Sequence, residues 1–134
     1  MPHIIDIGNI GSSNLGYISV AEPGKNIPFD IKRVYWTYFT PDNVERGHHA
    51  HRKLQQVIIA ASGKIYINTE TASGEKNEFC LLTPSQGLYI PKMVWRDIRF
   101  SEGAVLLSLA SMPYLPEDYI RSYDDFKKLC MDIK

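Results

Sequence analysis

Short apolar runs divided by Gly and Pro turns recur through the first 110 residues and constrain the fold more than any other feature. These runs are rich in β-branched and aromatic residues, which favour strands. We expect strands over residues 4–7, 17–20, 29–39, 54–60, 64–69, 77–82, 87–91 and 104–110, with a further strand at 47–51. Many short strands joined by tight turns indicate an antiparallel double sheet or barrel.

The hydrophobic period changes only in the C-terminal tail. From Pro116 onward the apolar residues fall at helical spacings, and acidic residues precede basic ones, as the helix dipole prefers. We therefore expect one helix over residues 116–134. A chain of 134 residues is long enough for one domain with its own core. The sequence predicts a single all-β domain, residues 1–134, closed by a C-terminal α-helix.

The charge balance excludes several classes of partner. Fifteen basic residues match fifteen acidic ones, so the chain has no net field that would attract nucleic acid or anionic lipid. No apolar run reaches the length of a membrane helix. Cys80 and Cys130 fit no CxxC or zinc pattern and are expected to be ordinary thiols in a reducing compartment. We therefore expect a cytoplasmic protein that binds neither nucleic acid nor membrane.

The densest group of chemically active residues is the string Arg46-Gly47-His48-His49-Ala50-His51. If Gly47 opens a strand, alternation points His49 and His51 to one face and His48 to the other. Two neighbouring imidazoles can ligate a metal ion, or they can move protons near neutral pH. The residues that surround them decide between these roles.

The pattern Gly47-x-His49-x-His51, followed by Gln56 and a glycine turn, resembles the first motif of the cupin superfamily of small jelly-roll barrels. Metal-binding cupins usually add a glutamate and a third histidine from a later motif. Here Gln56 replaces the glutamate, and Arg96 stands where the third histidine is expected. A guanidinium has no lone pair and repels a divalent ion. The resemblance thus implies a cupin-type antiparallel jelly roll, and the residues predict no metal.

A closer resemblance extends over roughly residues 27 to 126. The segments that carry it are residues 27–35, 46–51, 87–91, 103–107, 109–111 and 118–121, together with Gln56 and Trp95. They are similar to the dTDP-sugar 3,4-ketoisomerases. This family isomerises dTDP-4-keto-6-deoxyglucose to a 3-keto sugar without a cofactor, on the route to 3-amino-3,6-dideoxy sugars of bacterial surface glycans such as O-antigen lipopolysaccharide and S-layer glycan. The resemblance implies that His49 is the catalytic base.

The residues themselves are compatible with this chemistry. Moving a ketone from C4 to C3 through an enediol needs two proton carriers and no redox group. We expect His49 to act on carbon and His51 to hold or relay the oxygen proton, although the sequence leaves that division open. The residues expected to bind substrate are Arg33, Tyr35, Arg46, Gln56, Tyr89, Trp95 and Arg96. Arginines suit a diphosphate, and aromatic rings can pack on the base or the sugar.

Two alternative functions stay open from the sequence. One is a dTDP-4-keto-6-deoxyhexose epimerase, and the other is a cupin that binds a sugar nucleotide without catalysis. The stereochemistry at C4 of the product is also open, because Leu15 departs from the polar residue usual in the family. Members of the family form dimers, and an unpaired apolar edge strand invites aggregation. We therefore expect a homodimer in which residues 1 to about 25 join the partner's sheet.

Overall fold

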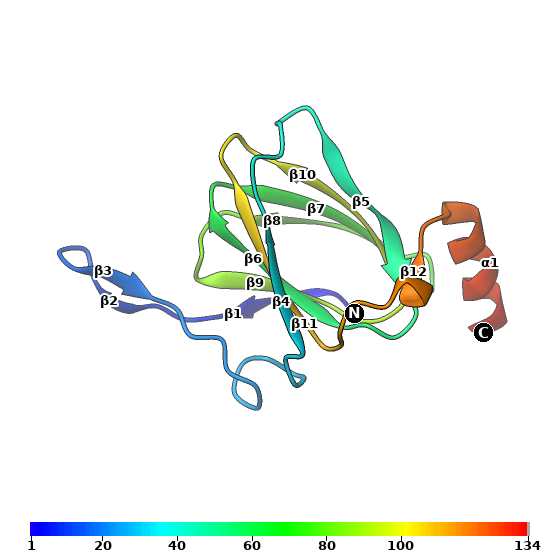
Figure 1. Cartoon of the computed structure of the whole chain (residues 1–134), viewed down its shortest axis with the longest axis horizontal. Helices are drawn as coiled ribbons and strands as arrows, with labels where there is room; N and C mark the ends of the chain where they lie inside the picture. The colour runs from blue at the N-terminus through cyan, green and yellow to red at the C-terminus, as the bar shows by residue number, and fades with distance from the viewer. Residues whose placement is uncertain (134) are drawn as a thin grey trace.

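Two five-stranded antiparallel sheets face each other around a common interior in the computed structural model, which describes residues 1–133 (Figure 1). The first sheet has the order β1 (His3–Asp6), β9 (Gln86–Ile90), β6 (Gln56–Ser62), β11 (Val105–Ala110), β4 (Arg33–Thr37). The second has the order β12 (Tyr119–Ile120), β5 (Glu45–His51), β10 (Val94–Phe100), β7 (Ile65–Thr71), β8 (Lys76–Leu81). This architecture confirms the predicted all-β jelly-roll class.

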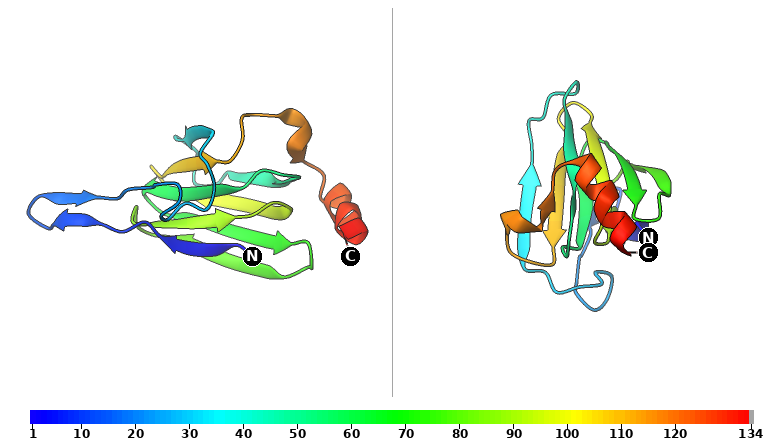
Figure 2. Two further views of the ribbon diagram at one scale, coloured as in Figure 1. Left: turned by 90° about the horizontal axis from the view of Figure 1, so that it is seen from below. Right: turned by 90° about the vertical axis from the view of Figure 1, so that its right-hand side faces the viewer.

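Four elements lie outside the two five-stranded sheets. Strands β2 (Ile10–Ser12) and β3 (Gly16–Ile18) form a hairpin that projects from one end of the body (Figures 1 and 2). A 3₁₀ turn, η1 (Pro116–Asp118), leads into β12, and the helix α1 (Tyr123–Ile133) lies at the opposite end. Within residues 1–133, no helix has the length and apolar content needed to cross a membrane.

The main core fills the space between the sheets. Its buried residues come from both sheets and from the turn before β11: Ile58, Ala60, Ile65, Ile67, Leu81, Leu88, Ile90, Val94, Ile98, Phe100, Ala104 and Leu106. Strand alternation produces this arrangement, because every second side chain of each strand points inward. Four of these residues, Ile58, Ile98, Phe100 and Leu106, also form part of the wall of the interior cavity described below.

The outer faces of both sheets are covered by chain segments that are not strands. Ile27 and its neighbours from residues 21–31 pack on Val57, Ile59 and Leu109 of the first sheet. On the second sheet, Phe126 and Cys130 of α1 pack against Trp95, Ala50 and Ile120. These two layers bury the apolar side chains that strand alternation turns away from the main core.

The sequence located most strands but misjudged some of their limits. The strand expected over residues 29–39 forms only at Arg33–Thr37, because Phe29 and Ile31 pack on the outer face of the first sheet and Phe39 takes a left-handed φ of 61°. The turn expected at residues 61–63 lies later, at Gly63 and Lys64, because β6 continues to Ser62. Strands β2, β10 and β12 were not predicted.

The helix predicted over residues 116–134 is wrong for its first part. It begins only at Tyr123, where the Ser122 hydroxyl accepts a hydrogen bond of 3.2 Å from the Asp125 backbone N–H, as an N-cap does. Upstream of this cap, Tyr119 and Ile120 are extended and pair with His51 and Ala50 of β5. The end of the chain therefore returns to the histidine strand.

Candidate active site

A bulge in β5 sets the direction of its histidines. Gly47 has a φ of 89°, and a Cβ there would lie 2.7 Å from the carbonyl oxygen of Arg96, so only glycine fits. Across to β10, Gly47 pairs with Asp97 and His49 with Arg96, which leaves His48 as an extra residue with a φ of 55°. Beyond the bulge, His49 and His51 turn to the same side, with ring centroids 4.8 Å apart.

His49 is held in one tautomer by its own strand. Its Nδ1 lies 2.9 Å from the carbonyl oxygen of Gly47. A carbonyl only accepts, so Nδ1 carries the proton and Nε2 of the neutral ring keeps its lone pair. Burial, reinforced by the positive charge of Arg96, lowers the pKa of His49 to about 4. His49 is therefore a neutral imidazole at physiological pH, with a free basic nitrogen on the cavity wall.

His51 lies deeper and is buried at 1% exposure. Its Nδ1 is 3.1 Å from Oδ2 of Asp118, and its ring contacts that of Tyr119 at a centroid distance of 4.4 Å. Burial first, then the charge of Arg96, lowers the pKa of His51 to about 2. The contact with Asp118 is thus a hydrogen bond from a neutral imidazole to a carboxylate. Both histidines are bases in their resting state.

Arg96 is a buried cation without a carboxylate partner among residues 1–133. Its guanidinium donates to the Gln56 side-chain oxygen and, at 2.9 Å, to the Val94 carbonyl, and its Nε has no hydrogen-bond acceptor. Burial lowers the pKa of Arg96 to about 10, which leaves it charged at neutral pH. A buried charge that is not neutralised attracts an anion.

Gln56 connects this cation to the first sheet. While its oxygen accepts from Arg96, its Nε2 donates to the Ser108 hydroxyl at 2.9 Å and to the Tyr35 hydroxyl at 3.4 Å. A glutamate at this position would neutralise Arg96 and add negative charge to the cavity. The amide holds the guanidinium in place and leaves its charge available.

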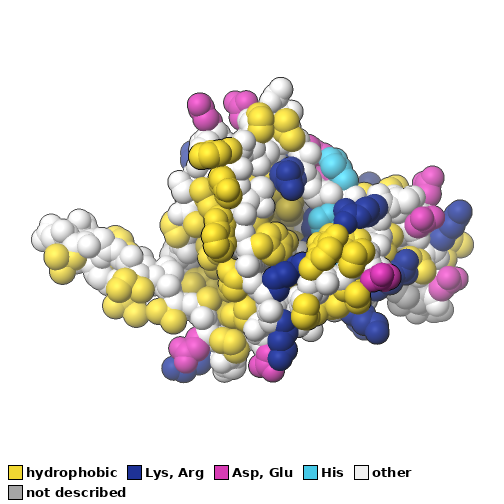
Figure 3. All heavy atoms as spheres, viewed as in Figure 1, with side chains coloured by type: hydrophobic (Ala, Val, Ile, Leu, Met, Phe, Trp, Pro, Cys, Tyr) yellow, Lys and Arg dark blue, Asp and Glu magenta, His cyan; other side chains and the backbone are white. Residues whose placement is uncertain are grey.

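More cations line the outer part of the cavity, which has a volume of about 580 Å³. Arg33, Arg46 and Arg121 all contribute to its wall. The Arg33 guanidinium lies 5.1 Å from the ring centroid of Tyr35, and that of Arg121 lies 4.3 Å from Tyr119. Figure 3 shows histidine side chains beside Lys and Arg side chains on this face. The cavity combines neutral bases with an excess of positive charge.

Of the residues predicted for the site, the structure brings together His49, His51, Arg33, Tyr35, Arg46, Gln56 and Arg96. It does not bring Tyr89 or Trp95 to this cavity. The Tyr89 hydroxyl donates to Gln55 at 2.7 Å on the outer face of the first sheet, and Trp95 packs against Tyr123 and Phe126. The reason is alternation, since Tyr89 and Trp95 are adjacent to inward-pointing residues of their strands.

Three residues at the site were missed because the sequence was assigned to a helix there. Asp118, Tyr119 and Arg121 reach the cavity or its histidines through the pairing of β12 with β5. One signal could have revealed this. Ser122, followed by Asp124 and Asp125, is a better helix start than Pro116, and it would have left Tyr119 and Ile120 free to form a strand.

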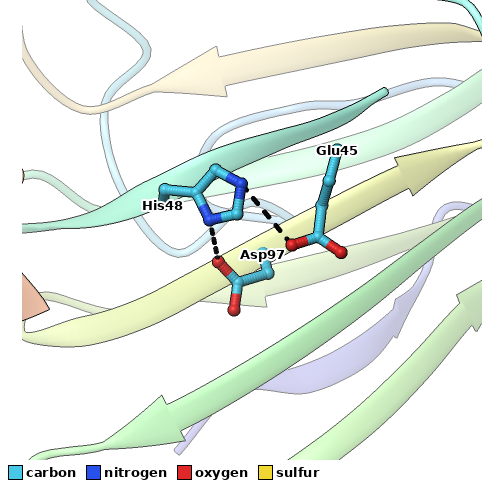
Figure 4. Close-up of side chains that lie close together, drawn as sticks. All are labelled: Glu45, His48 and Asp97. Atoms are coloured by element: carbon cyan, nitrogen blue, oxygen red, sulfur yellow. Dashed lines mark ion pairs between the residues drawn. The ribbon is translucent and has the colours of Figure 1, made fainter. Parts of the chain in front are cut away.

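The described residues that could hold a metal ion form a cluster in which Glu45 and His48 also line the cavity, whereas Asp97 does not. Glu45, His48 and Asp97 each place a ligand atom within 4.8 Å of the others (Figure 4). His48 Nδ1 is 2.7 Å from Asp97 Oδ1, and its Nε2 is 3.5 Å from Glu45 Oε1. Each nitrogen of the His48 ring therefore already faces a carboxylate. Inside the cavity, the histidines are accompanied by an amide and a guanidinium, a donor set that does not suit a metal ion.

Comparison with known proteins gives consistent matches over almost the whole chain. The family model described as "FdtA: WxcM-like, C-terminal" matches residues 1–131. The TDP-4-oxo-6-deoxy-alpha-D-glucose-3,4-oxoisomerase of Aneurinibacillus thermoaerophilus is 41% identical over 114 residues, which cover 84% of this chain and 81% of that protein.

Solved structures match as well. QdtA, a sugar 3,4-ketoisomerase from Thermoanaerobacterium thermosaccharolyticum in complex with TDP, superposes with a TM-score of 0.92 at 38% identity, covering 98% of this chain and 96% of QdtA. A histidine-to-asparagine variant of QdtA, in complex with TDP-4-keto-6-deoxyglucose, has a TM-score of 0.91 at 38% identity and covers 98% and 94%. With a family model and a curated relative that both span most of its length, the chain belongs to the FdtA (WxcM-like, C-terminal) family of sugar 3,4-ketoisomerases.

Proposed function

We propose that this protein converts dTDP-4-keto-6-deoxy-D-glucose into a dTDP-3-keto-6-deoxyhexose. The observation that carries the proposal is the pair of neutral imidazoles, 4.8 Å apart, beside the unpaired cation Arg96. Relatives with this fold at 38 to 41% identity are named as isomerases of such sugars, and QdtA binds TDP and TDP-4-keto-6-deoxyglucose.

The proposed reaction transfers protons only. His49 takes the proton from C3, the C3–H electrons form a C3=C4 double bond, and the C4 carbonyl oxygen receives a proton to give an enediol. The C3 hydroxyl then loses its proton, C3 becomes the carbonyl carbon, and C4 is protonated. Substrate and product are isomers, so neither oxidant nor reductant is consumed. We assign the transfer between the two oxygens to His51.

Arg96 supplies the electrostatic part of this mechanism. The intermediate carries developing negative charge on the sugar oxygens, and a preorganised buried cation stabilises such charge more strongly than water does. Its resting partner Gln56 is neutral, and no carboxylate among residues 1–133 forms an ion pair with Arg96. The arginines nearer the opening, Arg33, Arg46 and Arg121, are suited to the diphosphate.

One experiment separates this proposal from its alternatives. The protein is incubated with dTDP-4-keto-6-deoxyglucose in deuterated water, and the sugar is followed by NMR. We expect a 3-keto product with deuterium at C4. Inversion of carbon centres with the ketone still at C4 would identify an epimerase, and an unchanged sugar that nevertheless binds would identify a non-catalytic module. Either of these results contradicts the proposal.

The wider role and the assembly are also proposals. A 3-keto sugar is the substrate that a transaminase needs to make a 3-amino-3,6-dideoxy sugar, and we place the protein in the biosynthesis of such sugars for bacterial surface glycans, in the cytoplasm. We further propose a homodimer. Ile10, Leu15, Tyr17 and Ile18 are exposed on the projecting β2–β3 hairpin, which a second copy would cover.

The pairing within one chain indicates which part of the N-terminal segment a partner subunit would have to cover. Strand β1 pairs with β9 of its own chain, so the free apolar surface begins at the hairpin. Exchange of the whole segment 1–25 stays a prediction. Sedimentation equilibrium should show a dimer at micromolar concentration, and deletion of residues 1–20 should abolish it. An active monomer under these conditions would refute the dimer without affecting the proposed reaction.

A further inference from the structure

Asp118 is a buried carboxylate whose hydrogen bonds converge on the histidine strand. It is 4% exposed and lies at the end of η1, immediately before the two residues that pair with β5. Its Oδ2 is 3.1 Å from His51 Nδ1 and 3.2 Å from the Leu54 backbone N–H, and its Oδ1 accepts from the Lys53 N–H at 2.8 Å. All three neighbours are N–H groups that require an acceptor.

We infer that Asp118 is a positioning residue for the reaction. It holds the proton of His51 on Nδ1 and so leaves Nε2 unprotonated and able to accept the transferred proton. This inference rests on the proposed function. An ionised carboxylate can only accept, so the imidazole must donate from Nδ1. No residue among 1–133 makes a hydrogen bond to His51 Nε2. The ring of His51 also lies edge to face with that of His49, at an interplanar angle of 86°.

The two site histidines are then prepared in the same way by different means. The Gly47 carbonyl fixes Nδ1–H of His49 from within the strand, and Asp118 fixes Nδ1–H of His51 from 67 residues away. The acceptor for His49 is a backbone carbonyl of β5, whereas the acceptor for His51 is a single side chain. A single substitution can therefore change the tautomer of His51 but not that of His49.

Substitution of Asp118 by Asn is predicted to reverse the tautomer. If the Asn oxygen keeps the Lys53 N–H, its NH₂ group faces His51 and donates to Nδ1, which moves the ring proton to Nε2. In the flipped orientation, the NH₂ group would face the Lys53 N–H, and both of these donors would lack an acceptor. The first orientation is favoured because it gives up only the longer bond from the Leu54 N–H, at 3.2 Å, keeps the shorter bond from the Lys53 N–H, at 2.8 Å, and gives the NH₂ group an acceptor on His51.

The experiment combines NMR of the histidine nitrogens with kinetics on the full-length protein. In the wild type we expect His51 to be protonated at Nδ1 and unprotonated at Nε2. In Asp118→Asn we expect the reverse, together with a fall in kcat of about 100-fold or more, because a misplaced proton removes one acid–base partner. KM and TDP affinity should stay close to wild type. Asp97→Asn is the matched control, since Asp97 contacts His48 on the outer face, and its kcat should not change.

Each result decides the inference. A wild-type His51 protonated at Nε2 overturns it even if Asp118→Asn does not fold. A reversed tautomer with unchanged kcat overturns the link to the reaction, and so does an equal loss of kcat in Asp97→Asn. Restoration of much of the activity in Asp118→Glu, with Nδ1–H regained, supports it. The proposed function fails separately, if the wild type yields no 3-keto product or if His51→Asn retains full activity.

Discussion

Strand β5 carries three histidines within four residues, and the protein uses them in two different ways. His49 and His51 face the interior, where burial and Arg96 lower their pKa values and acceptors fix their Nδ1 protons. His48, displaced by the bulge, lies between two carboxylates on the outer face, with its side chain 55% exposed. The same residue type becomes a neutral base in one environment and a surface group between two carboxylates in the other.

The difference shows that the backbone decides the chemistry here. A single glycine with a left-handed φ inserts the extra residue that separates His48 from its neighbours. Without the bulge, alternation alone would still divide the histidines, but His49 would lose the Gly47 carbonyl that fixes its tautomer. Preorganisation of the bases therefore depends on local strand geometry as much as on the residues.

The largest effect on kcat is expected from replacing a histidine of the inner face, and the matched replacement on the outer face tests the comparison directly. Asn at position 49 removes the base and keeps a polar side chain, so His49→Asn should lower kcat by about 10²–10⁴-fold. TDP should still bind, because the arginines that suit the diphosphate are unchanged, and calorimetry can verify this. His48→Asn is the matched control on the same strand and should retain near-native kcat. Similar losses in both variants would remove the distinction between the two faces.

A smaller but still large effect is expected from Arg96. Arg96→Met removes the unpaired guanidinium and roughly preserves its volume. We expect kcat to fall by about 10²-fold, as when one preorganised donor is lost. The pKa of His49 should rise, because burial remains but the repulsion from Arg96 is gone, and the acid limb of the kcat/KM profile should move to higher pH.

Stability provides the control for this variant. Replacing an unpaired buried charge with an apolar side chain is often neutral or stabilising. The melting temperature of Arg96→Met should therefore not fall with its activity. A large loss of thermal stability alongside the loss of kcat would indicate that Arg96 mainly supports the fold.

The sequence predicted the inner part of the site better than its outer part. Strand alternation was enough to bring His49 and His51 together and to pair Arg33 with Tyr35 on one face. The same rule, applied to β9 and β10, would have excluded Tyr89 and Trp95, since Leu88, Ile90 and Arg96 are the inward residues. Tyr89 and Trp95 were assigned to the site for their aromatic character, but their outward positions in the strand alternation keep them away from the cavity.

The contribution of residues 118–121 could not be inferred from local pattern once the segment had been assigned to a helix. Tyr119 and Ile120 fit the helical spacing of the tail, yet they form a strand because pairing with β5 satisfies their backbone groups. That pairing is long-range, and propensity contains no information about it. The acceptor of His51 was therefore visible only in the structure.

A moderate effect is expected on stability in acid. The folded-state pKa values of His49 and His51 lie below the unfolded value near 6.5, so the unfolded chain binds more protons as pH falls. Stability should therefore be little affected by these groups above about pH 7 and should decline between pH 6.5 and about 4.5, by about 2 kcal/mol for each of the two histidines. Urea unfolding at the two pH values measures this change.

The variants of β5 identify the groups responsible for the acid effect. His49→Asn and His51→Asn should each reduce the loss of stability between the two pH values. His48→Asn is the control variant on the same strand, because it also removes one histidine but from the solvent-exposed outer face. A loss that survives in both inner variants would assign the acid sensitivity to other groups.

The smallest expected effect is that of a chelator, and it tests the two faces at once. In the cavity, both Nδ1 atoms are engaged, Gln56 is committed to Arg96, and Arg96 repels a divalent ion, so treatment with EDTA should leave kcat unchanged. If a metal ion binds this protein, the outer cluster of Glu45, His48 and Asp97 offers better ligands. Loss of turnover that one added metal restores would contradict the prediction. In that case, Asp97→Asn would be treated with EDTA as well. If this variant also lost turnover, the essential ion would lie in the cavity, and if EDTA had no effect on it, the ion would lie at the outer cluster.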